Sequence, residues 1–288
     1  MQVTKLSDAT LRPRKIAVGE FDGVHLGHRE VIAGNDTVLT FEPHPMMVLH
    51  PERAPKLITS LEVKIELIEK LGVSELVIVP FDTVIAQQSP REFINQVLVQ
   101  QLGATHVSVG ANFHFGHGAT GTTALLEGDE RFKTRIVPLV EADGDRISST
   151  RIRGLLSDGS VADAARLLGE PFRMRGEVVG GDRRGRELGF PTANMVPDAR
   201  FVCPANGVYA CRVLDQMAAV NVGVRPTFGE GLHVLVESFL LDFAGDLYGQ
   251  TLTVEFVQRL RGEERFESVE SLVAQMTRDV EAARELLA

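Results

Sequence analysis

The apolar segments of this chain change their pattern near residue 170, and that change constrains the fold more than any other feature. Before it, segments of helical spacing alternate with short apolar runs, at residues 15–19, 37–41, 76–81, 106–110 and 135–140. Strands separated by helices predict a parallel sheet built from βαβ crossovers. After it, strand-like runs follow one another across short glycine-rich or polar turns, which predicts an antiparallel barrel.

The chain of 288 residues is long enough for two domains that each bury a core. We place them at residues 1–169 and 170–288 and expect an α/β fold followed by a mainly β fold. The strand-like runs of the second domain are residues 174–179, 207–214, 219–222, 234–242 and 252–260. A closing helix is predicted to begin at Ser268, because apolar residues recur there at helical spacing.

Composition narrows the class of protein. A hydrophobic content of 44% and a charged content of 24% exclude a disordered or collagen-like chain. The apolar runs are too short for a membrane span of about 20 residues, and no secretory signal is present, so we expect a cytoplasmic protein without a membrane partner. Both halves are acidic within a net charge of −9, which argues against a nucleic-acid partner and favours a small anionic ligand.

One glycine- and histidine-rich string, residues 19–28, directly follows the first predicted strand and opens a helix. Backbone N–H groups at such a helix start favour a phosphate group. His25 and His28 could donate hydrogen bonds to phosphoryl oxygens, and Gly27 would let the backbone approach the ligand. Two alternatives are that both histidines are surface residues, or that they bind a metal, although no third ligand lies nearby in the sequence.

Three further features of the first half carry candidate site residues. The Ser/Thr cluster in residues 147–153 is either an N-cap or, with Arg153, a place for a leaving pyrophosphate. His44 and Asn112 follow the second and fourth predicted strands, where ligands bind in open α/β sheets. His44 lies between prolines and equally fits a turn residue. Both a structural and a ligand-binding role stay open for Asn112.

The second domain opens on residues 180–194, which combine glycines and arginines with the sequence Pro-Thr-Ala-Asn. A flexible basic loop is the simple alternative, but Thr192 and Asn194 offer hard oxygen donors that suit Mg²⁺ and nucleotide phosphates. Glu237 lies in an apolar strand and is the candidate carboxylate to accept a proton from a hydroxyl nucleophile. Its alternative role is that of a solvent-facing strand residue.

Together these strings resemble the bacterial bifunctional riboflavin kinase/FAD synthetase (FMN adenylyltransferase) family, in that family's order and over nearly the whole chain. The segments that carry the resemblance are residues 21–28, 40–45, 112–116, 147–153, 189–194, 221–228 and 246–249. The resemblance implies a Rossmann-like nucleotidyltransferase sheet in residues 1–169, which converts FMN and ATP to FAD and pyrophosphate. For residues 170–288 it implies an antiparallel six-stranded β-barrel with a closing helix, which phosphorylates riboflavin to FMN from ATP.

The resemblance also implies roles for single residues. The catalytic residues that it implies are His25, His28, Arg153 and Glu237, with Glu237 as general base. The implied ATP- or phosphate-binding residues are Gly19, Phe21, Asp22, Gly27, Ser148, Ser149, Thr150, Gly185, Arg186, Gly189, Pro191 and Thr192. The implied flavin-binding residues are His44, Asn112 and Arg225, and the implied Mg²⁺ ligands are Thr192 and Asn194. The expected partners are riboflavin, FMN, FAD and ATP, bound by a monomer or weak homo-oligomer.

One departure from the family pattern lies between His28 and Thr40, where the chain is shorter by about three helical turns. The helix that presents His28 is therefore predicted to have barely two turns and to depend on packing. This leaves two alternatives open. One is a riboflavin kinase with a weakened adenylyltransferase domain. The other is a non-catalytic flavin-binding regulatory module, against which the joint presence of the predicted site residues argues.

Overall fold

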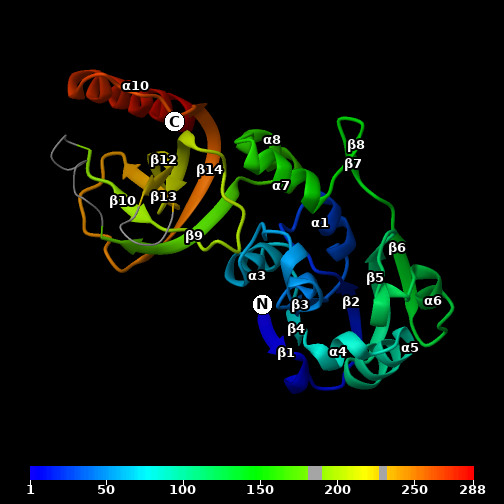
Figure 1. Ribbon diagram of the computed structural model, residues 1–288. Helices are drawn as coiled ribbons and strands as arrows, with labels where there is room; N and C mark the ends of the chain where they lie inside the picture. Colours follow the sequence, from blue (N-terminus) through cyan, green and yellow to red (C-terminus); the bar gives the residue numbers. More distant parts are fainter. Residues whose placement is uncertain (181–189, 227–231) are drawn as a thin grey trace. The chain divides into compact units, whose positions relative to one another are not determined.

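The computed structural model describes residues 1–180, 190–226 and 232–288, and the contacts within it divide the chain into two compact units (Figure 1). The first unit comprises Met1–Pro55 and Leu61–Ser149. The second comprises Lys56–Ser60 and Thr150–Ala288. The two units differ in class, as the change of sequence pattern predicts. None of the described helices is long and apolar enough to cross a membrane.

The first unit is built on a six-stranded parallel sheet with the strand order β1-β4-β3-β2-β5-β6. Its strands are β1 (Gln2–Lys5), β2 (Arg14–Val18), β3 (Thr37–Glu42), β4 (Glu75–Pro80), β5 (Ala104–Gly110) and β6 (Lys133–Val137). Five of these confirm the predicted runs. The edge strand β1 was not predicted, because three of its four residues are exposed and it shows no apolar run.

The helical segments of the first unit connect these strands. They are η1 (Leu6–Asp8), α1 (Leu26–Ile32), α2 (Pro45–Leu49), η2 (Pro51–Arg53), α3 (Leu61–Glu69), α4 (Thr83–Gln87), α5 (Pro90–Glu92), η3 (Phe93–Gln101), η4 (His117–Ala119) and α6 (Thr123–Glu127). A two-stranded hairpin of β7 (Glu141–Ala142) and β8 (Asp145–Arg146) follows β6. At the start of α5, Ser89 and Glu92 form a reciprocal capping box. The spacing of Ser89, Pro90 and Glu92 in the sequence is typical of such a helix start.

The sheet is covered on both faces, because successive residues of a strand point to opposite sides. Ile16 and Val18 of β2 pack in one buried cluster with residues of η3. Ala17, which lies between them, packs in another cluster with residues of α1 and α3. The first unit is therefore a three-layer α/β/α structure, which agrees with the Rossmann-like arrangement expected from the sequence.

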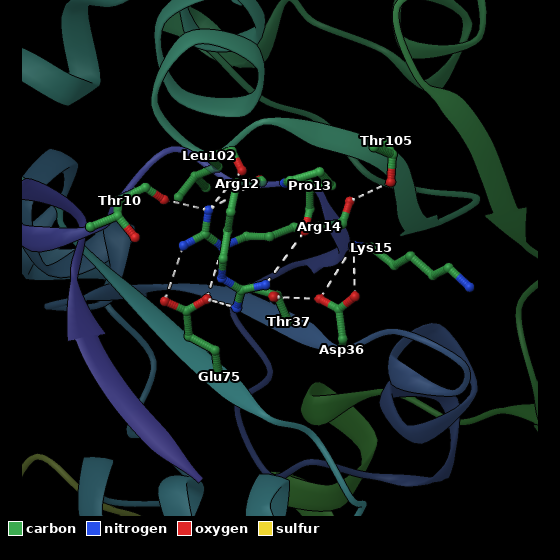
Figure 2. A network of polar contacts seen from close by, with 10 residues as sticks. All are labelled: Thr10, Arg12, Pro13, Arg14, Lys15, Asp36, Thr37, Glu75, Leu102 and Thr105. Atoms are coloured by element: carbon green, nitrogen blue, oxygen red, sulfur yellow. Dashed lines mark hydrogen bonds and ion pairs between the residues drawn. The ribbon is translucent and has the colours of Figure 1, made fainter.

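A buried ion pair joins the amino ends of β2 and β4 on either side of β3 (Figure 2). Arg14 Nε donates to Glu75 Oε2 at 2.8 Å, and Arg12 Nη2 donates to the same oxygen at 2.6 Å. The Nη1 atom of Arg14 donates to the carbonyls of Thr10 and Leu102, each at 2.8 Å. The side chain of Arg14 is only 1% exposed. The charges of Arg14 and Glu75 are thus partnered where water is excluded, while Arg12 adds a partner from the surface.

The helix α1, which the sequence predicts to be short, has seven residues. Asn35 Nδ2 donates to the carbonyls of Val31 and Ile32 at 3.0 and 3.1 Å. Arg135 Nη1 donates to the carbonyl of Ala33 at 2.7 Å. These carbonyls belong to the helix end, where intrahelical partners run out. The side chains of Val31 and Ile32 are buried, so packing and capping together stabilise a helix that would be marginal alone.

The second unit contains a closed antiparallel barrel with the strand order β10-β13-β12-β11-β14-β9. Its strands are β9 (Phe172–Val179), β10 (Ala193–Met195), β11 (Gly207–Val213), β12 (Gln216–Pro226), β13 (Leu232–Leu240) and β14 (Thr251–Arg261). Its helices are α7 (Ser149–Ser157, which begins in the first unit), α8 (Val161–Leu168) and α10 (Val269–Leu287). The contacts group α8 with the barrel, and the boundary at 169/170 stays a prediction.

The closing helix α10 packs on the outside of the barrel, as Figure 1 shows. Ser268 caps it by accepting a hydrogen bond from the Ser271 amide, which confirms the predicted start. The strand β12 begins three residues before the predicted run at 219–222. The reason is a tight turn at Leu214 and Asp215, both at positive φ, which lets β11 and β12 pair almost from the turn.

We expect Glu75→Gln to lower the free energy of unfolding by about 3–5 kcal/mol, because it leaves the buried Arg14 without its counter-ion. Burial raises the pKa of Glu75, but the hydrogen bond and charge of Arg14 and the charge of Arg12 lower it more, to below its ordinary value of 4.5. The wild-type protein therefore has this stabilisation above pH 4.5 and loses it as the pH falls through the lower folded-state pKa, whereas the variant does not. Urea unfolding at a series of pH values measures both effects.

The matched control for this prediction is Glu130→Gln, which removes an exposed carboxylate of the same unit. It should change the free energy of unfolding by less than about 0.5 kcal/mol. Equal losses in the two variants would contradict the role assigned to the buried pair.

We expect Asn35→Ala to lower the local stability of α1 by about 1–2 kcal/mol, because the side-chain hydrogen bonds to the carbonyls of Val31 and Ile32 are lost and Ile32 keeps only the backbone amide of residue 35. Asn35→Asp should cost more, since it also places a negative charge at the carboxyl end of the helix. Hydrogen exchange of the α1 amides measures this local free energy. Exchange rates in α1 that stay at the wild-type level in both variants would show that the amide of Asn35 does not stabilise the helix.

Candidate active sites

The strand order of the first unit places two predicted site loops next to each other. From β2 the chain builds outward through β3 and β4 on one side, and later through β5 and β6 on the other. The carboxyl ends of β2 and β5 therefore flank a topological switch point, where open α/β sheets bind ligands. Residues 19–28, here called the phosphate loop, follow β2, and Asn112 follows β5. The fold thus brings both sequence-predicted segments to one edge of the sheet.

The two histidines of the phosphate loop form one unit at the start of α1. His25 is the N-cap residue, and its Nδ1 accepts a hydrogen bond from the His28 amide at 3.2 Å. The imidazole rings are stacked, with centroids 3.5 Å apart and planes inclined by 15°. Because Nδ1 of His25 is an acceptor, the neutral ring carries its proton on Nε2. The two predicted histidines therefore lie together, and Nε2 of His25 is a hydrogen-bond donor.

The glycines of the phosphate loop make room for these rings. A Cβ atom on Gly27 would lie 3.2 Å from Cε1 of His25, and one on Gly19 would lie 3.0 Å from the ring of Phe21. Phe21 is 1% exposed and meets His28 edge-on, with ring centroids 5.4 Å apart. From the sequence, Gly27 is predicted to allow close approach of a ligand. In the structure it also admits the ring of His25.

The phosphate loop has an unusual backbone that neighbouring elements hold in place. Phe21 and Val24 have φ values of +51° and +41°, a region that side chains disfavour. Ser149, the first residue of α7, donates its hydroxyl to the carbonyl of Asp22 at 3.0 Å. One hydroxyl of the predicted Ser/Thr cluster thus reaches the loop. Such strained backbone persists only where the surroundings hold it.

The remaining residues of that cluster differ in position. Ser148 lies in the first unit with Ser149, whereas Thr150 and Arg153 lie in the second. Arg153 Nε donates to the carbonyl of Lys56 at 2.7 Å, a contact within the second unit. The expected role of Arg153 toward pyrophosphate stays a prediction.

Glu20 connects the phosphate loop to three other segments, and sequence reasoning did not single it out. Its carbonyl accepts hydrogen bonds from Thr40 Oγ1 at 3.0 Å and from Lys64 Nζ at 2.8 Å. Its carboxylate lies 2.8 Å from His44 Nε2. Nδ1 of His44 accepts from the Met46 amide at 3.2 Å, so Nε2 carries the proton and donates to Glu20. His44 is thereby the N-cap of α2, as its turn-residue alternative suggests, and it also holds Glu20.

The loop after β5 presents Asn112 at the surface. The rings of Phe113 and Phe115 stack with centroids 5.5 Å apart, and Phe115 is buried. The Asn112 carbonyl accepts from His114 Nδ1 at 3.0 Å, while the side chain of Asn112 is exposed. The two phenylalanines anchor the loop to the core. The exposed side-chain amide of Asn112 is therefore available to a ligand at the switch point.

In the barrel, Glu237 lies in the middle of a cross-strand row. Asn194 of β10 and Asn221 of β12 are its direct partners on the two neighbouring strands. Asn221 Nδ2 donates to Glu237 Oε2 at 3.3 Å. The flanking residues Val236 and Ser238 point into the barrel and are 0% and 2% exposed, so Glu237 lies on the outer face. Sequence reasoning predicted Glu237 and Asn194 but gave no role to Asn221.

This row also offers donors for a divalent cation. Asn194 is 6% exposed, and its buried Oδ1 has no hydrogen-bond partner among the described residues. Thr192 precedes it by two residues, and Phe190 anchors this segment by packing edge-on against Phe239 at 5.3 Å. A hydroxyl, an amide oxygen and a carboxylate are the oxygen ligands that Mg²⁺ accepts. The residues present therefore fit the metal expected from the sequence.

Other predicted residues of the barrel site are described less fully. Gly185, Arg186 and Gly189 lie outside the described residues. Pro191 is exposed beside Thr192, and Arg225 belongs to β12 by its backbone. Over the described ranges, no group of three or more His, Cys, Asp or Glu side chains could hold a metal ion.

Two family models match the chain, and they divide it within a few residues of the predicted boundary. The FAD synthetase model matches residues 7–151, and the riboflavin kinase model matches residues 168–287. Among solved structures, a crystal structure described as a macrolide-efflux protein from Streptococcus pneumoniae is similar, with a TM-score of 0.87 and 32% identity over 99% of both chains. The likeness therefore extends over both units.

Curated relatives give the same result over nearly the full length. The Escherichia coli K12 bifunctional riboflavin kinase/FMN adenylyltransferase is 38% identical over 98% of this chain and 96% of its own. The proteins of that name from Listeria monocytogenes and Bacillus subtilis are 37% and 38% identical, over 95% and 93% of this chain and 92% and 90% of theirs. By motifs, fold and similarity, the chain belongs to the bifunctional riboflavin kinase/FMN adenylyltransferase family.

Proposed function

We propose that the chain carries out two successive transfers from ATP. It phosphorylates riboflavin to FMN in residues 170–288, and it then adenylylates FMN to FAD in residues 1–169, with release of pyrophosphate. The observation that carries this proposal is that each unit holds an ordered group of polar side chains that includes predicted catalytic residues, His25 and His28 in the first unit and Glu237 in the second. These groups are the stacked pair of His25 and His28, and the row of Asn194, Glu237 and Asn221.

In the kinase reaction, Glu237 acts as general base. It accepts the proton of the terminal ribityl hydroxyl of riboflavin while that oxygen attacks the γ-phosphorus of ATP. The bond from this phosphorus to the ADP oxygen breaks, and ADP leaves. The amide of Asn221 orients the carboxylate, since it donates to Oε2. A base held in this way supports a transfer that depends on positioning and electrostatics.

Mg²⁺ belongs to this site by the chemistry of its donors. Thr192 and Asn194 would hold the ion, and the buried Oδ1 of Asn194 supports this assignment. When bound, Mg²⁺ offsets the negative charge on the phosphates of ATP. Because Asn194 is the direct strand partner of Glu237, donors for the metal and the base share one face of the barrel.

In the adenylyltransferase reaction, a phosphate oxygen of FMN attacks the α-phosphorus of ATP. The bond from this phosphorus to the bridging oxygen breaks, and pyrophosphate leaves without a covalent enzyme intermediate. His25 and His28 donate hydrogen bonds to the phosphoryl oxygens and stabilise the charge that develops there. Asn112 is proposed to place FMN, His44 to act there through Glu20, which it holds, and Arg153 to stabilise pyrophosphate. The preorganised phosphate loop supports this assignment, since orientation is a large part of such catalysis.

A kinase with a weakened adenylyltransferase domain was the main alternative, because of the short helix after His28. The structure contains that short helix, but with its last carbonyls capped by Asn35 and Arg135. The His25–His28 pair sits at its other end. These contacts show that the short helix is held in place, which supports an adenylyltransferase activity beside the kinase activity. Incubation of the protein with riboflavin, ATP and Mg²⁺ tests the whole proposal, since FMN that accumulates without FAD would refute the second activity.

We expect Glu237→Gln to lower kcat for FMN formation by about 100- to 10,000-fold, because the amide cannot accept the hydroxyl proton. FAD formation from added FMN should stay at the wild-type rate, because the other unit performs it. Glu177→Gln, which alters an exposed strand residue of the same barrel, is the control. Wild-type FMN formation by Glu237→Gln would remove Glu237 from the role of general base.

We expect His28→Ala to lower kcat for FAD formation by about 100- to 1,000-fold, because a donor to the phosphoryl oxygens is lost. FMN formation by the same sample should be unchanged, because the other unit performs it, and hydrogen exchange of the amides of the first unit shows that this unit is folded. His117→Ala removes an exposed histidine of the same unit and serves as the control. The assignment fails if the two variants form FAD at the same rate.

A further inference from the structure

Lys64 is a buried lysine that the proposed mechanism does not use. Its residue is 6% exposed, on the helix α3, whose other buried side chains Val63, Leu67 and Ile68 are apolar and pack toward the sheet. A buried ammonium group is costly unless polar partners compensate for the lost water. A lysine on the apolar face of a helix therefore needs an explanation from its contacts.

The contacts of Lys64 all point to the carboxyl ends of β2 and β3. Its Nζ donates to the Glu20 carbonyl at 2.8 Å. Burial lowers the pKa of Lys64, while the negative charges of Asp22, Glu42 and Glu20 act in the opposite direction and favour the ammonium form. Two of these three carboxylates belong to the phosphate loop. The lysine thus interacts with the loop both by a hydrogen bond and by charge.

The Glu20 carbonyl, which accepts two side-chain hydrogen bonds, directly precedes the strained part of the phosphate loop. Thr40 Oγ1 is its second donor, at 3.0 Å. The next residue, Phe21, has a φ of +51°, and the chain then turns through Gly23 at +88° toward His25. Strain of this kind costs about 1–3 kcal/mol and has to be offset by surrounding contacts. The lysine is placed where it can supply that compensation.

We propose that Lys64 is a positioning residue of the adenylyltransferase site, which holds the Glu20 carbonyl and thereby fixes the phosphate loop and its two histidines. The proposal rests on the proposed role of His25 and His28. Lys64 is buried beneath the loop, so it acts through the backbone of Glu20. Removal of the Lys64 ammonium group should therefore lower the rate enhancement that His25 and His28 give to FAD formation, although Lys64 itself does not touch the reacting atoms.

Lys64→Met keeps most of the side-chain volume and removes the ammonium group, and we expect it to lower kcat for FAD formation about 10- to 100-fold. Lys64→Gln keeps a hydrogen-bond donor and should lose less. Lys70→Met removes an exposed lysine just beyond the same helix and should leave the rate unchanged. FMN formation by every sample reports the amount of active second unit, and hydrogen exchange of the α3 amides reports whether the first unit is folded.

A double-mutant cycle separates positioning from simple destabilisation. If Lys64 acts through the loop, Lys64→Met should lower the rate much less in the His28→Ala background than in the wild-type background. A variant that merely contains less folded protein would lose the same factor in both. Should Lys64→Met not fold, Thr40→Val removes the other donor to the same carbonyl, and its cycle with His28→Ala gives the same test.

Two results would overturn the proposal. One is a rate for Lys64→Met within twofold of the wild type, and the other is an equal loss in both backgrounds. Failure of the proposed function looks different, because the wild-type protein would then form FMN but no FAD. If the wild type forms FAD and the cycle shows no coupling, the role of Lys64 alone is refuted.

Discussion

The buried ion pair of Arg14 and Glu75 is the interaction on which the first site depends. It ties the amino ends of β2 and β4 together across β3, in a region where neither charge could remain without the other. Parallel strands that are aligned at one edge also end at defined positions on the opposite edge. There Glu20 follows β2 and accepts a hydrogen bond from Thr40 of β3. A shift in register would separate these two residues.

The two units present their reactive groups in different ways, and the sheet geometry of each explains the difference. In the parallel sheet the strands end side by side at one edge, so the reactive side chains lie in the loops that follow the strands. Such a loop must be held in place by other elements. Glu20 is therefore contacted from β3, from α3 and from the residue before α2. In the antiparallel barrel, direct strand partners share a face, so Asn194, Glu237 and Asn221 are aligned by pairing alone.

Local patterns were sufficient to predict the two fold classes, five strands of the parallel sheet, the start of α10 at Ser268 and the short helix α1. They also predicted His25 with His28, and Glu237 with Asn194, and the structure places the members of each pair together, while their roles stay predictions. They missed the strand β1, which has no apolar run of its own. They also missed Lys64 and Asn221, since neither residue has a distinguishing neighbour in the sequence. A lysine in an apolar helix stripe was the available signal for the first.

The sequence by itself determined which chemistry this protein carries, because residue types and their spacing along the chain set the candidate bases, phosphate donors and metal ligands. Only the tertiary structure decided which groups hold them in place. Lys64 meets Glu20 across a helix and a loop that are 44 residues apart, and Asn221 meets Glu237 across two strands. The reason is physical. Strand order and register bring such pairs together, and these arise from the packing of the whole unit, which no local pattern of residues encodes.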